Sequence, residues 1–184
     1  MFDELSPPYS TIVADPPWQH DEGSPVNAWG RVGDARKRVR LRYSSLPVAE
    51  ITALPVADLA AADAHLYLWT TNRFLRHAWS IAEAWGFKPS QMLTWCKPPV
   101  GVGPGGAFAN TSEFVLFCRR GSLSHLTRVE STWWEWPRGP HSAKPAAFLD
   151  LVERVSPGPY VELFARAPRL GWDSWGYGYE SAAS

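Results

Sequence analysis

The sequence predicts an α/β domain built on a largely parallel β-sheet. Short apolar runs typical of buried strands alternate along the chain with amphipathic stretches of helical period. The length of 184 residues suits one domain with a substantial core, and no internal repeat divides the chain, so we expect a single domain over residues 1–184. In such sheets, ligands bind beyond the carboxyl ends of the strands.

The first half of the chain alternates strand, helix, strand and helix. Residues 11–14 form a short apolar strand that ends before two prolines. Ser44 or Ser45 can cap a short helix that has a proline in its first turn. Residues 65–71 form a second apolar strand, and apolar residues then recur at helical spacing over 74–85, where a glycine ends the helix.

The second half contains three further strands and one helix. Residues 90–97 and 112–119 are apolar runs of strand length, separated by a glycine- and proline-rich loop. Residues 121–143 show no regular period, and we expect them to be irregular. An amphipathic helix over 144–155, with a proline in its first turn, leads into a last strand over 160–165.

The charge of the chain is balanced overall but uneven along it. Eighteen basic residues match eighteen acidic ones, so the chain lacks the global field of a protein that grips nucleic acid mainly by charge. Residues 31–42 nevertheless hold six Arg or Lys against one Asp. We expect a basic arm at 19–43 in which Arg38 and Arg40 contact phosphates, the alternative being a solvated charged loop.

Cysteine content and hydropathy exclude several other classes. Cys96 and Cys118 are expected to be buried free thiols, and the absence of paired Cys or His spacing predicts no metal site. No run approaches the roughly 18 apolar residues of a membrane span. The first residues lack the pattern of an export signal, so we expect a cytoplasmic protein that binds no membrane.

The stretch Asp15, Pro16, Pro17 and Trp18 has the clearest chemical meaning. The prolines stop the strand and hold Asp15 at its tip. The amino group of adenine is a poor nucleophile because its lone pair is delocalised into the ring. The Asp15 carboxylate and the Pro16 carbonyl could accept its two N–H bonds, and Trp18 could stack on the base. A capped turn is the structural alternative.

This motif and later segments resemble one known family. The stretches "ADPPW", "AWGF", "HSAKP" and "ELFAR" stand in the order of the adenine amino-methyltransferases related to the catalytic subunit of the messenger-RNA adenosine methyltransferase, which has bacterial and phage members. The resemblance covers about residues 9–176. It implies a Rossmann-like methyltransferase sheet that is circularly permuted, with the catalytic motif first and the strand that binds S-adenosylmethionine last. S-adenosylmethionine is the cofactor that it implies.

The resemblance also assigns site residues. It gives the catalytic role to Asp15, Pro16, Pro17 and Trp18, and cofactor binding to Ser142, Lys144, Glu162, Phe164, Arg166 and Tyr177. Strand alternation predicts that Glu162, Phe164 and Arg166 share one face. Glu162 is either a ligand group or locked to an arginine, because a buried glutamate is costly unless paired.

Alternatives stay open at several of these positions. Arg166 could form a structural salt bridge instead of binding a carboxylate. Ser142 could simply cap the helix that is expected to start near Lys144. Tyr177 departs from the family pattern, which usually has asparagine at this position.

Six residues are candidates for contacts with the substrate. Tyr43 could flank the base or anchor a loop, and Glu113 could orient the cofactor or the target, or merely cap a strand. Asn72 and Lys97 lie just beyond strand ends. The full set is Tyr43, Arg38, Arg40, Asn72, Lys97 and Glu113.

Together these features predict S-adenosylmethionine-dependent methylation of the 6-amino group of adenine in DNA. A target in duplex DNA would have to be flipped out of the stack. The alternatives are the same reaction on RNA, methylation of another planar amine, and a non-catalytic nucleic-acid-binding subunit. The expected partner is nucleic acid, in the cytoplasm of a bacterial or phage-infected cell, and a homodimer or a partner subunit is compatible with the small neutral chain.

Overall fold

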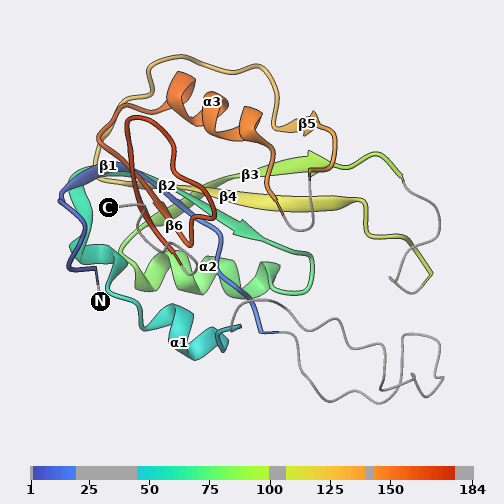
Figure 1. The fold of residues 1–184 in the computed structure, drawn as a ribbon, viewed down its shortest axis with the longest axis horizontal. Coiled ribbons are helices and arrows are strands. Elements are labelled where there is room, and N and C mark those ends of the chain that lie inside the picture. The colour runs from blue at the N-terminus through green and yellow to red at the C-terminus, as the bar shows by residue number, and fades with distance from the viewer. Residues whose placement is uncertain (1, 20–44, 100–106, 140–142, 177–184) are drawn as a thin grey trace, which may run out of the picture.

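A computed structural model describes residues 2–19, 45–99, 107–139 and 143–176. Within these residues, seven strands form one sheet in the order β5-β3-β4-β2-β1-β6-β7 (Figure 1). The strands are β1 (Tyr9–Ala14), β2 (Ala60–Thr70), β3 (Lys88–Cys96), β4 (Ser112–Arg120), β5 (Trp133–Glu135), β6 (Tyr160–Leu163) and β7 (Trp172–Trp175).

The predicted parallel arrangement is present in the part of the sheet around β1. This strand lies between β2 and β6 and is parallel to both, and β7 is parallel to β6. The sheet is nevertheless mixed, because β4 runs antiparallel to both β2 and β3. The carboxyl ends of β1, β2 and β6 therefore meet at one edge, where the amino end of β4 also lies.

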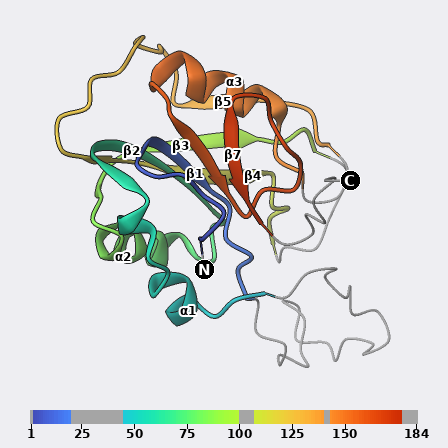
Figure 2. The ribbon, with the colours of Figure 1, turned by 60° about the vertical axis from the view of Figure 1, so that its left-hand side comes forward.

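Helices cover both faces of the sheet (Figures 1 and 2). The helices α1 (Val48–Thr52) and α2 (Leu75–Ala84), with a short 3-10 helix over Val56–Asp58, lie on one face, and α3 (Ala146–Val155) lies on the other. Strand alternation produces the two buried clusters: Ile12 of β1 packs on the α2 side, and Val13 packs with Phe148 on the α3 side. Among the described helices, none is long and apolar enough to cross a membrane.

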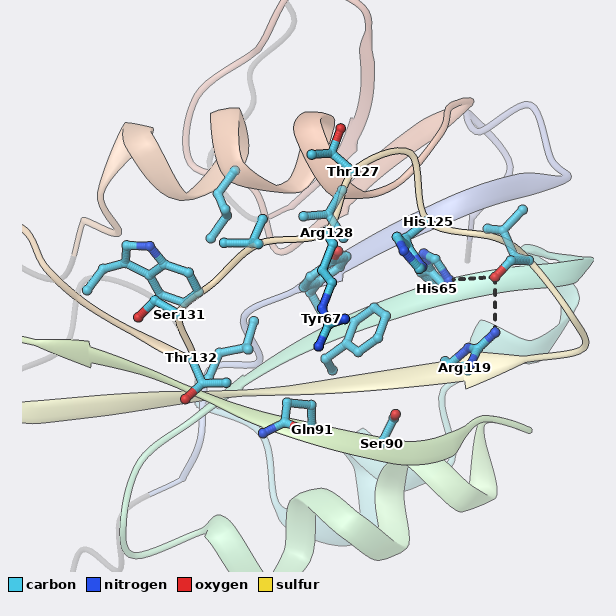
Figure 3. A pocket seen from close by; sticks show the side chains of 17 residues that line it. His65, Tyr67, Ser90, Gln91, Arg119, His125, Thr127, Arg128, Ser131 and Thr132 are labelled. Atoms are coloured by element: carbon cyan, nitrogen blue, oxygen red, sulfur yellow. Dashed lines mark hydrogen bonds between the residues drawn. The ribbon is translucent and has the colours of Figure 1, made fainter.

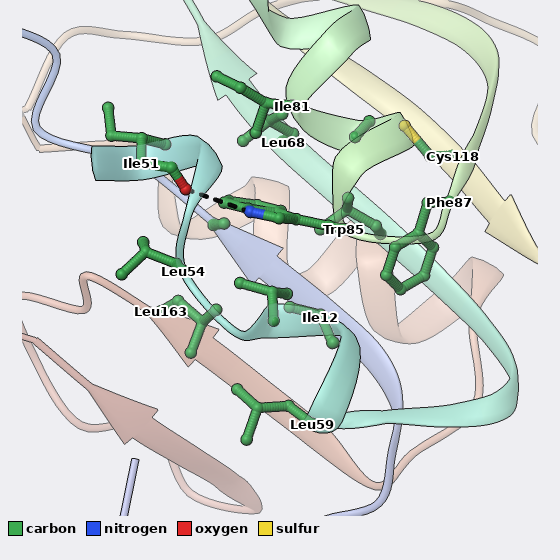
Figure 4. Close-up of a cluster of buried hydrophobic side chains, with 14 of the residues drawn as sticks. Ile12, Ile51, Leu54, Leu59, Leu68, Ile81, Trp85, Phe87, Cys118 and Leu163 are labelled. Atoms are coloured by element: carbon green, nitrogen blue, oxygen red, sulfur yellow. Dashed lines mark hydrogen bonds between the residues drawn. The ribbon is translucent and has the colours of Figure 1, made fainter. Parts of the chain in front are cut away.

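Trp85 lies at the centre of the cluster under α2 (Figure 4). Its side chain is 1% exposed and packs among aliphatic side chains that include Ile12 and Ile81. The indole Nε1 donates a hydrogen bond of 3.2 Å to the carbonyl of Ile51 in α1. Trp85 therefore joins α1 and α2 to the sheet.

The two cysteines are free thiols, as the sequence predicted. Cys118 in β4 is fully buried, and burial raises the pKa of its thiol to about 12. Cys96 at the end of β3 is only partly buried. Both lie in the strands that the sequence predicted.

The third helix begins later than predicted. Its N-cap is Pro145, so Lys144 precedes the helix and does not stand in its first turn. The proline lacks an amide hydrogen and its extended backbone defines the start of the helix. Ser142, for which capping of this helix was one alternative, lies outside the described residues.

The strand predicted over 160–165 ends at Leu163. Phe164 has a φ of 65°, a left-handed conformation that breaks the alternation of the strand. Its side chain packs in the same cluster as Leu163, so the prediction that it shares a face with Glu162 is wrong. The short strands β5 and β7 were not predicted.

The loop between β6 and β7 is fastened to α3 by Arg169. The guanidinium donates two hydrogen bonds of 2.9 Å to Glu153 and one of 2.6 Å to Asp150. The indole Nε1 of Trp172 donates a further bond of 2.7 Å to Glu153. The hydrogen bonds from Arg169 lower the pKa of Glu153. This network holds the segment that follows β6 in place at the edge of the sheet.

Candidate active site

Asp15 lies at the edge where the parallel strands end. Its amide donates a hydrogen bond of 3.3 Å to the carbonyl of Leu163, which joins the end of β1 to the end of β6. Asn72 follows β2 by two residues and is exposed at the same edge. This is the placement that the sequence predicted for the ends of these strands.

The residues after Asp15 form a tight, braced turn. The carbonyl of Pro16 accepts a hydrogen bond of 2.9 Å from the amide of Trp18, and the carbonyl of Pro17 accepts one of 2.8 Å from Leu46. A carbonyl oxygen has two lone pairs, so the Pro16 carbonyl keeps one acceptor position. The turn therefore retains the two acceptors, the Asp15 carboxylate and the Pro16 carbonyl, to which the sequence interpretation assigned the N–H bonds of an amine.

Trp18 does not offer the open ring that the sequence interpretation gave it. Its side chain is 6% exposed and stacks on Phe74, with ring centroids 5.1 Å apart and an interplanar angle of 16°. The large apolar ring is more stable in the core under α2 than in water. Its buried Nε1 finds no hydrogen-bond partner within the described part of the chain.

Four predicted site residues form one chain of ion pairs. Lys144 Nζ lies 2.7 Å from Asp15 Oδ2 and 3.3 Å from Glu113 Oε2. Lys97 Nζ lies 2.5 Å from Glu113 Oε1. All four side chains are only 10–21% exposed, although they come from four different segments of the chain. The structure thus unites residues that were predicted to have catalytic, cofactor and substrate roles.

Two tryptophans complete this cluster. Lys144 Nζ lies 5.1 Å from the ring centroid of Trp69, and Lys97 Nζ lies 5.1 Å from that of Trp95. Both contacts are of cation–π type, which favours a charged ammonium. Sequence reasoning missed these tryptophans, although each stands near the end of a strand that leads to this edge.

The contacts within the cluster favour the charged forms of Glu113 and Lys144. Burial alone would raise the pKa of Glu113, but the ammonium groups of Lys144 and Lys97 outweigh it and the pKa is lowered. Burial alone would lower the pKa of Lys144, but the carboxylates of Asp15 and Glu113 outweigh it and the pKa is raised. The lysine is therefore an ammonium that fixes the Asp15 carboxylate.

Replacing Glu113 with glutamine is expected to lower the free energy of unfolding at pH 7 by about 3 kcal/mol, because the buried ammonium of Lys97 loses its carboxylate. Urea denaturation measures the change. The exposed Glu135 of β5 provides the control, and Glu135→Gln should change stability by less than about 0.5 kcal/mol. Adding Lys97→Met to Glu113→Gln should restore part of the loss, and a double variant no more stable than Glu113→Gln would contradict this account.

Glu162 in β6 is the candidate group for the methyl donor. It lies beside Val13 of β1 and Ser174 of β7, on the face that α3 covers. No hydrogen bond to its carboxylate occurs among the described residues, and burial, followed by the charge of Asp15, raises its pKa to about 7. The hydroxyl of Ser174 is also buried without a partner in the described part of the chain. These unsatisfied polar groups fit a ligand with hydroxyl and amine donors, as S-adenosylmethionine has.

The raised pKa of Glu162 predicts a pH-dependent stability. The folded protein binds a proton on Glu162 between its ordinary pKa of 4.5 and about 7, and the unfolded chain does not. Stability is therefore lost as the pH rises through this window. Glu162→Gln should raise the free energy of unfolding at pH 8.5 by on the order of 1–3 kcal/mol and leave it unchanged at pH 4.

Urea denaturation across this pH range tests the prediction. The difference between the two proteins isolates Glu162 from other titrating groups such as His65, whose pKa is lowered by burial. Glu83→Gln, at an exposed position of α2, is the control and should follow the wild-type curve. If the free energy of unfolding of Glu162→Gln changed with pH in parallel with that of the wild type, the carboxylate of Glu162 would already be paired.

The remaining predicted residues are more scattered. Arg166 is exposed, and its charge acts on Glu162 and Lys144. Phe164 is 8% exposed and packs edge-on against Trp175 at 5.3 Å, as part of the core. Five further candidates lie outside the described residues: Arg38, Arg40, Tyr43, Ser142 and Tyr177.

Comparison with known proteins shows the family to which the chain belongs. The MT-A70 family model matches residues 9–178. The chain is 30% identical over 180 residues to the type II methyltransferase M.MunI of Mycoplasma sp, covering 91% of this chain and 76% of the relative. It is 28% identical over 187 residues to the N6-methyladenosine RNA methyltransferase MTA1 of Cryphonectria parasitica, covering 95% of this chain and 53% of the relative.

A third relative extends the range of the similarity. The chain is 28% identical over 188 residues to the human N(6)-adenine-specific methyltransferase METTL4, covering 91% of this chain and 37% of the relative. The chain thus spans about half the length of MTA1 and less than half the length of METTL4. Strand β1, which ends just before Asp15, and strand β6 lie side by side in the sheet, in the chain order that the resemblance implied. The family match over almost the whole chain shows that it belongs to the MT-A70 family.

Proposed function

We propose that this protein transfers a methyl group from S-adenosylmethionine to the 6-amino group of adenine in DNA. The observation that carries the proposal is the Asp15 carboxylate at the end of β1, held on one oxygen by Lys144 at 2.7 Å. Its other oxygen and the Pro16 carbonyl are the acceptors for the two N–H bonds of the amine. The names of METTL4 and MTA1, which specify N6 of adenine or adenosine, support the target atom.

The residues of the chain would prepare the amine for attack. Accepting both N–H bonds favours a geometry in which the nitrogen lone pair leaves the ring system. Lys144 prevents the carboxylate from rotating, and the two prolines fix the direction of the carbonyl. Once methylated, the nitrogen carries a positive charge, which Asp15 stabilises until the proton leaves to Asp15 or to water.

The donor would bind across the ends of β1 and β6. S-adenosylmethionine supplies an electrophilic methyl group on its sulfonium. Glu162 and Ser174 would hold its hydroxyl or amine groups, because both lack partners among the described residues. Lys144 and Arg166 remain predicted to neutralise its carboxylate.

DNA is the proposed polymer. The similarity to a type II methyltransferase, of whose length the chain covers 76%, supports this choice. RNA is the second candidate, which the name of MTA1 supports. The similarity to a type II methyltransferase also leads us to propose that the protein acts in the cytoplasm of a bacterial or phage-infected cell. That it forms a homodimer or binds a partner subunit stays a prediction from the sequence.

The test is transfer of tritium from labelled S-adenosylmethionine to duplex DNA, single-stranded DNA and structured RNA in separate reactions. We expect label in DNA, recovered as 6-methyladenine after digestion. Label in RNA alone would replace DNA by RNA as the substrate. No label in any polymer, while calorimetry still detects donor binding, would favour the non-catalytic subunit.

A further inference from the structure

A cavity of about 490 Å³, shown in Figure 3, lies on the α3 face of the sheet, and none of the four ion-pair residues lines it. Its floor contains Tyr67 of β2, Leu93 of β3 and Phe117 of β4. One wall is the last part of α3, including Leu151, and residues 123–132 cover it. A volume of this size holds a small organic group.

The lining combines aromatic faces with uncompensated positive charge. The aromatic faces belong to Tyr67, Phe117 and Trp134, and the cations to Arg119 and Arg128, with no acidic side chain in the lining. Figure 3 shows Arg128 extending from the covering loop into the cavity. Within the described residues, Arg128 makes no hydrogen bond or ion pair. Guanidinium groups bind phosphate oxygens strongly, and aromatic faces stack on bases.

His65 has a structural role in this cavity. Its Nδ1 lies 2.7 Å from the hydroxyl of Ser156 and its Nε2 lies 3.2 Å from the carbonyl of Leu123. Burial lowers the pKa of His65, so the ring is neutral at pH 7. Arg119 also donates to the Leu123 carbonyl, at 3.2 Å, and this shared contact holds the covering loop on the sheet. Arg128 is thus the cation left to receive a ligand.

The cavity and the ion-pair cluster share one face of the sheet. Leu93 in the cavity precedes Lys97 by four residues, a separation of about 13 Å along an extended strand. Trp134 of the cavity wall stacks on Trp136, with centroids 5.5 Å apart and planes 5° apart. The carbonyl of Trp136 accepts a hydrogen bond of 3.0 Å from Trp95, whose ring contacts Lys97. A continuous aromatic layer therefore links the two sites.

We propose that this cavity binds one nucleotide of the strand that carries the target adenine, an inference that rests on the proposed function. The base stacks on Phe117 or Trp134, and the phosphate pairs with Arg128. The cavity thereby fixes the strand at a position adjacent to the methylated base and contributes to substrate selection.

The test is calorimetric binding of a short single-stranded thymidine oligonucleotide to the Asp15→Ala protein in 0.15 M salt. This probe contains no adenine, so it reports contacts other than those of the target base. We expect Arg128→Glu to weaken binding by about tenfold or more. Gln91→Trp, which fills the cavity from its exposed rim on β3, should weaken binding similarly without changing charge. Arg154→Glu, at an exposed position of α3 outside the cavity, is the charge control and should weaken binding less than about twofold.

Equal losses for Arg128→Glu and Arg154→Glu, or unchanged binding for Gln91→Trp, would overturn the inference. Free thymidine monophosphate distinguishes the two sources of a nucleotide. Binding as tight as that of the oligonucleotide, together with an unchanged KM for DNA in Arg128→Glu, would assign the cavity to a free nucleotide and overturn the strand assignment. A raised KM with unchanged kcat supports it. Because the binding measurement needs no methylation, failure of the proposed function and failure of this inference are separable.

Discussion

Replacing Asp15 with asparagine is expected to lower the turnover number by about a hundredfold or more, in keeping with the loss of a single preorganised electrostatic contact at a reacting group. The amide keeps the size of the side chain but removes the charge that attracts Lys144 at 2.7 Å and that is proposed to stabilise the methylated amine. Steady-state methylation of DNA with labelled donor measures the effect. The donor affinity, measured by calorimetry, should change far less, because Glu162 and not Asp15 is the proposed donor contact.

A matched control is Asp58→Asn, which makes the same change at an exposed position beyond the α1 helix. It should retain the wild-type turnover number. Equal activity of the Asp15→Asn and wild-type proteins would remove Asp15 from the mechanism. A loss of donor binding as large as the loss of turnover would instead assign Asp15 to the donor site.

Replacing Trp85 with alanine is expected to lower the free energy of unfolding by about 3–5 kcal/mol, the range for deleting a large aromatic side chain from a core. The side chain is 1% exposed, and the substitution would also leave the Ile51 carbonyl without its indole donor. Because typical domains are stable by only about 5–15 kcal/mol, this loss would remove a large fraction of the stability. Urea denaturation monitored by circular dichroism measures the loss.

Trp133→Ala provides the comparison within the same chain. This side chain is 60% exposed on the short strand β5, and its removal should cost less than about 1 kcal/mol. Similar losses for the two tryptophans would mean that burial does not account for the stability contributed by Trp85.

Much of the sheet was predictable because its strands carry their own signals. The apolar runs that became β1, β2, β3, β4 and β6 are long enough, or sharply enough ended by proline, to be recognised locally. The strands β5 and β7 have only three and four residues, and they exist because a neighbouring strand pairs with them. No local pattern distinguishes such segments from loops. The antiparallel direction of β4 likewise depends on the path of the chain between strands.

The sequence predicted the site residues that belong to a recognisable motif. It did not predict the contacts that these residues make in the folded protein. Asp15, Glu113, Lys97 and Lys144 were each singled out, yet their union into one ion-pair chain is a property of the folded edge. Trp18 was predicted to stack on a base, because the local sequence does not show that its ring packs on Phe74 from a distant segment. Phe164 was placed on the wrong face because a positive φ at a residue other than glycine is uncommon and leaves no mark in the sequence.

The central position of β1 has a consequence for how the protein folds during synthesis. β1 requires β6 as a neighbour, and residue 11 pairs with residue 160. A ribosome-bound chain that has emerged only as far as α3 would therefore expose one edge of β1 to other chains. Contacts of such large sequence separation also slow the closing step of folding. If the methyl donor binds across β1 and β6 as proposed, its binding would require the completed fold. Incomplete nascent chains would then be the form most dependent on chaperones.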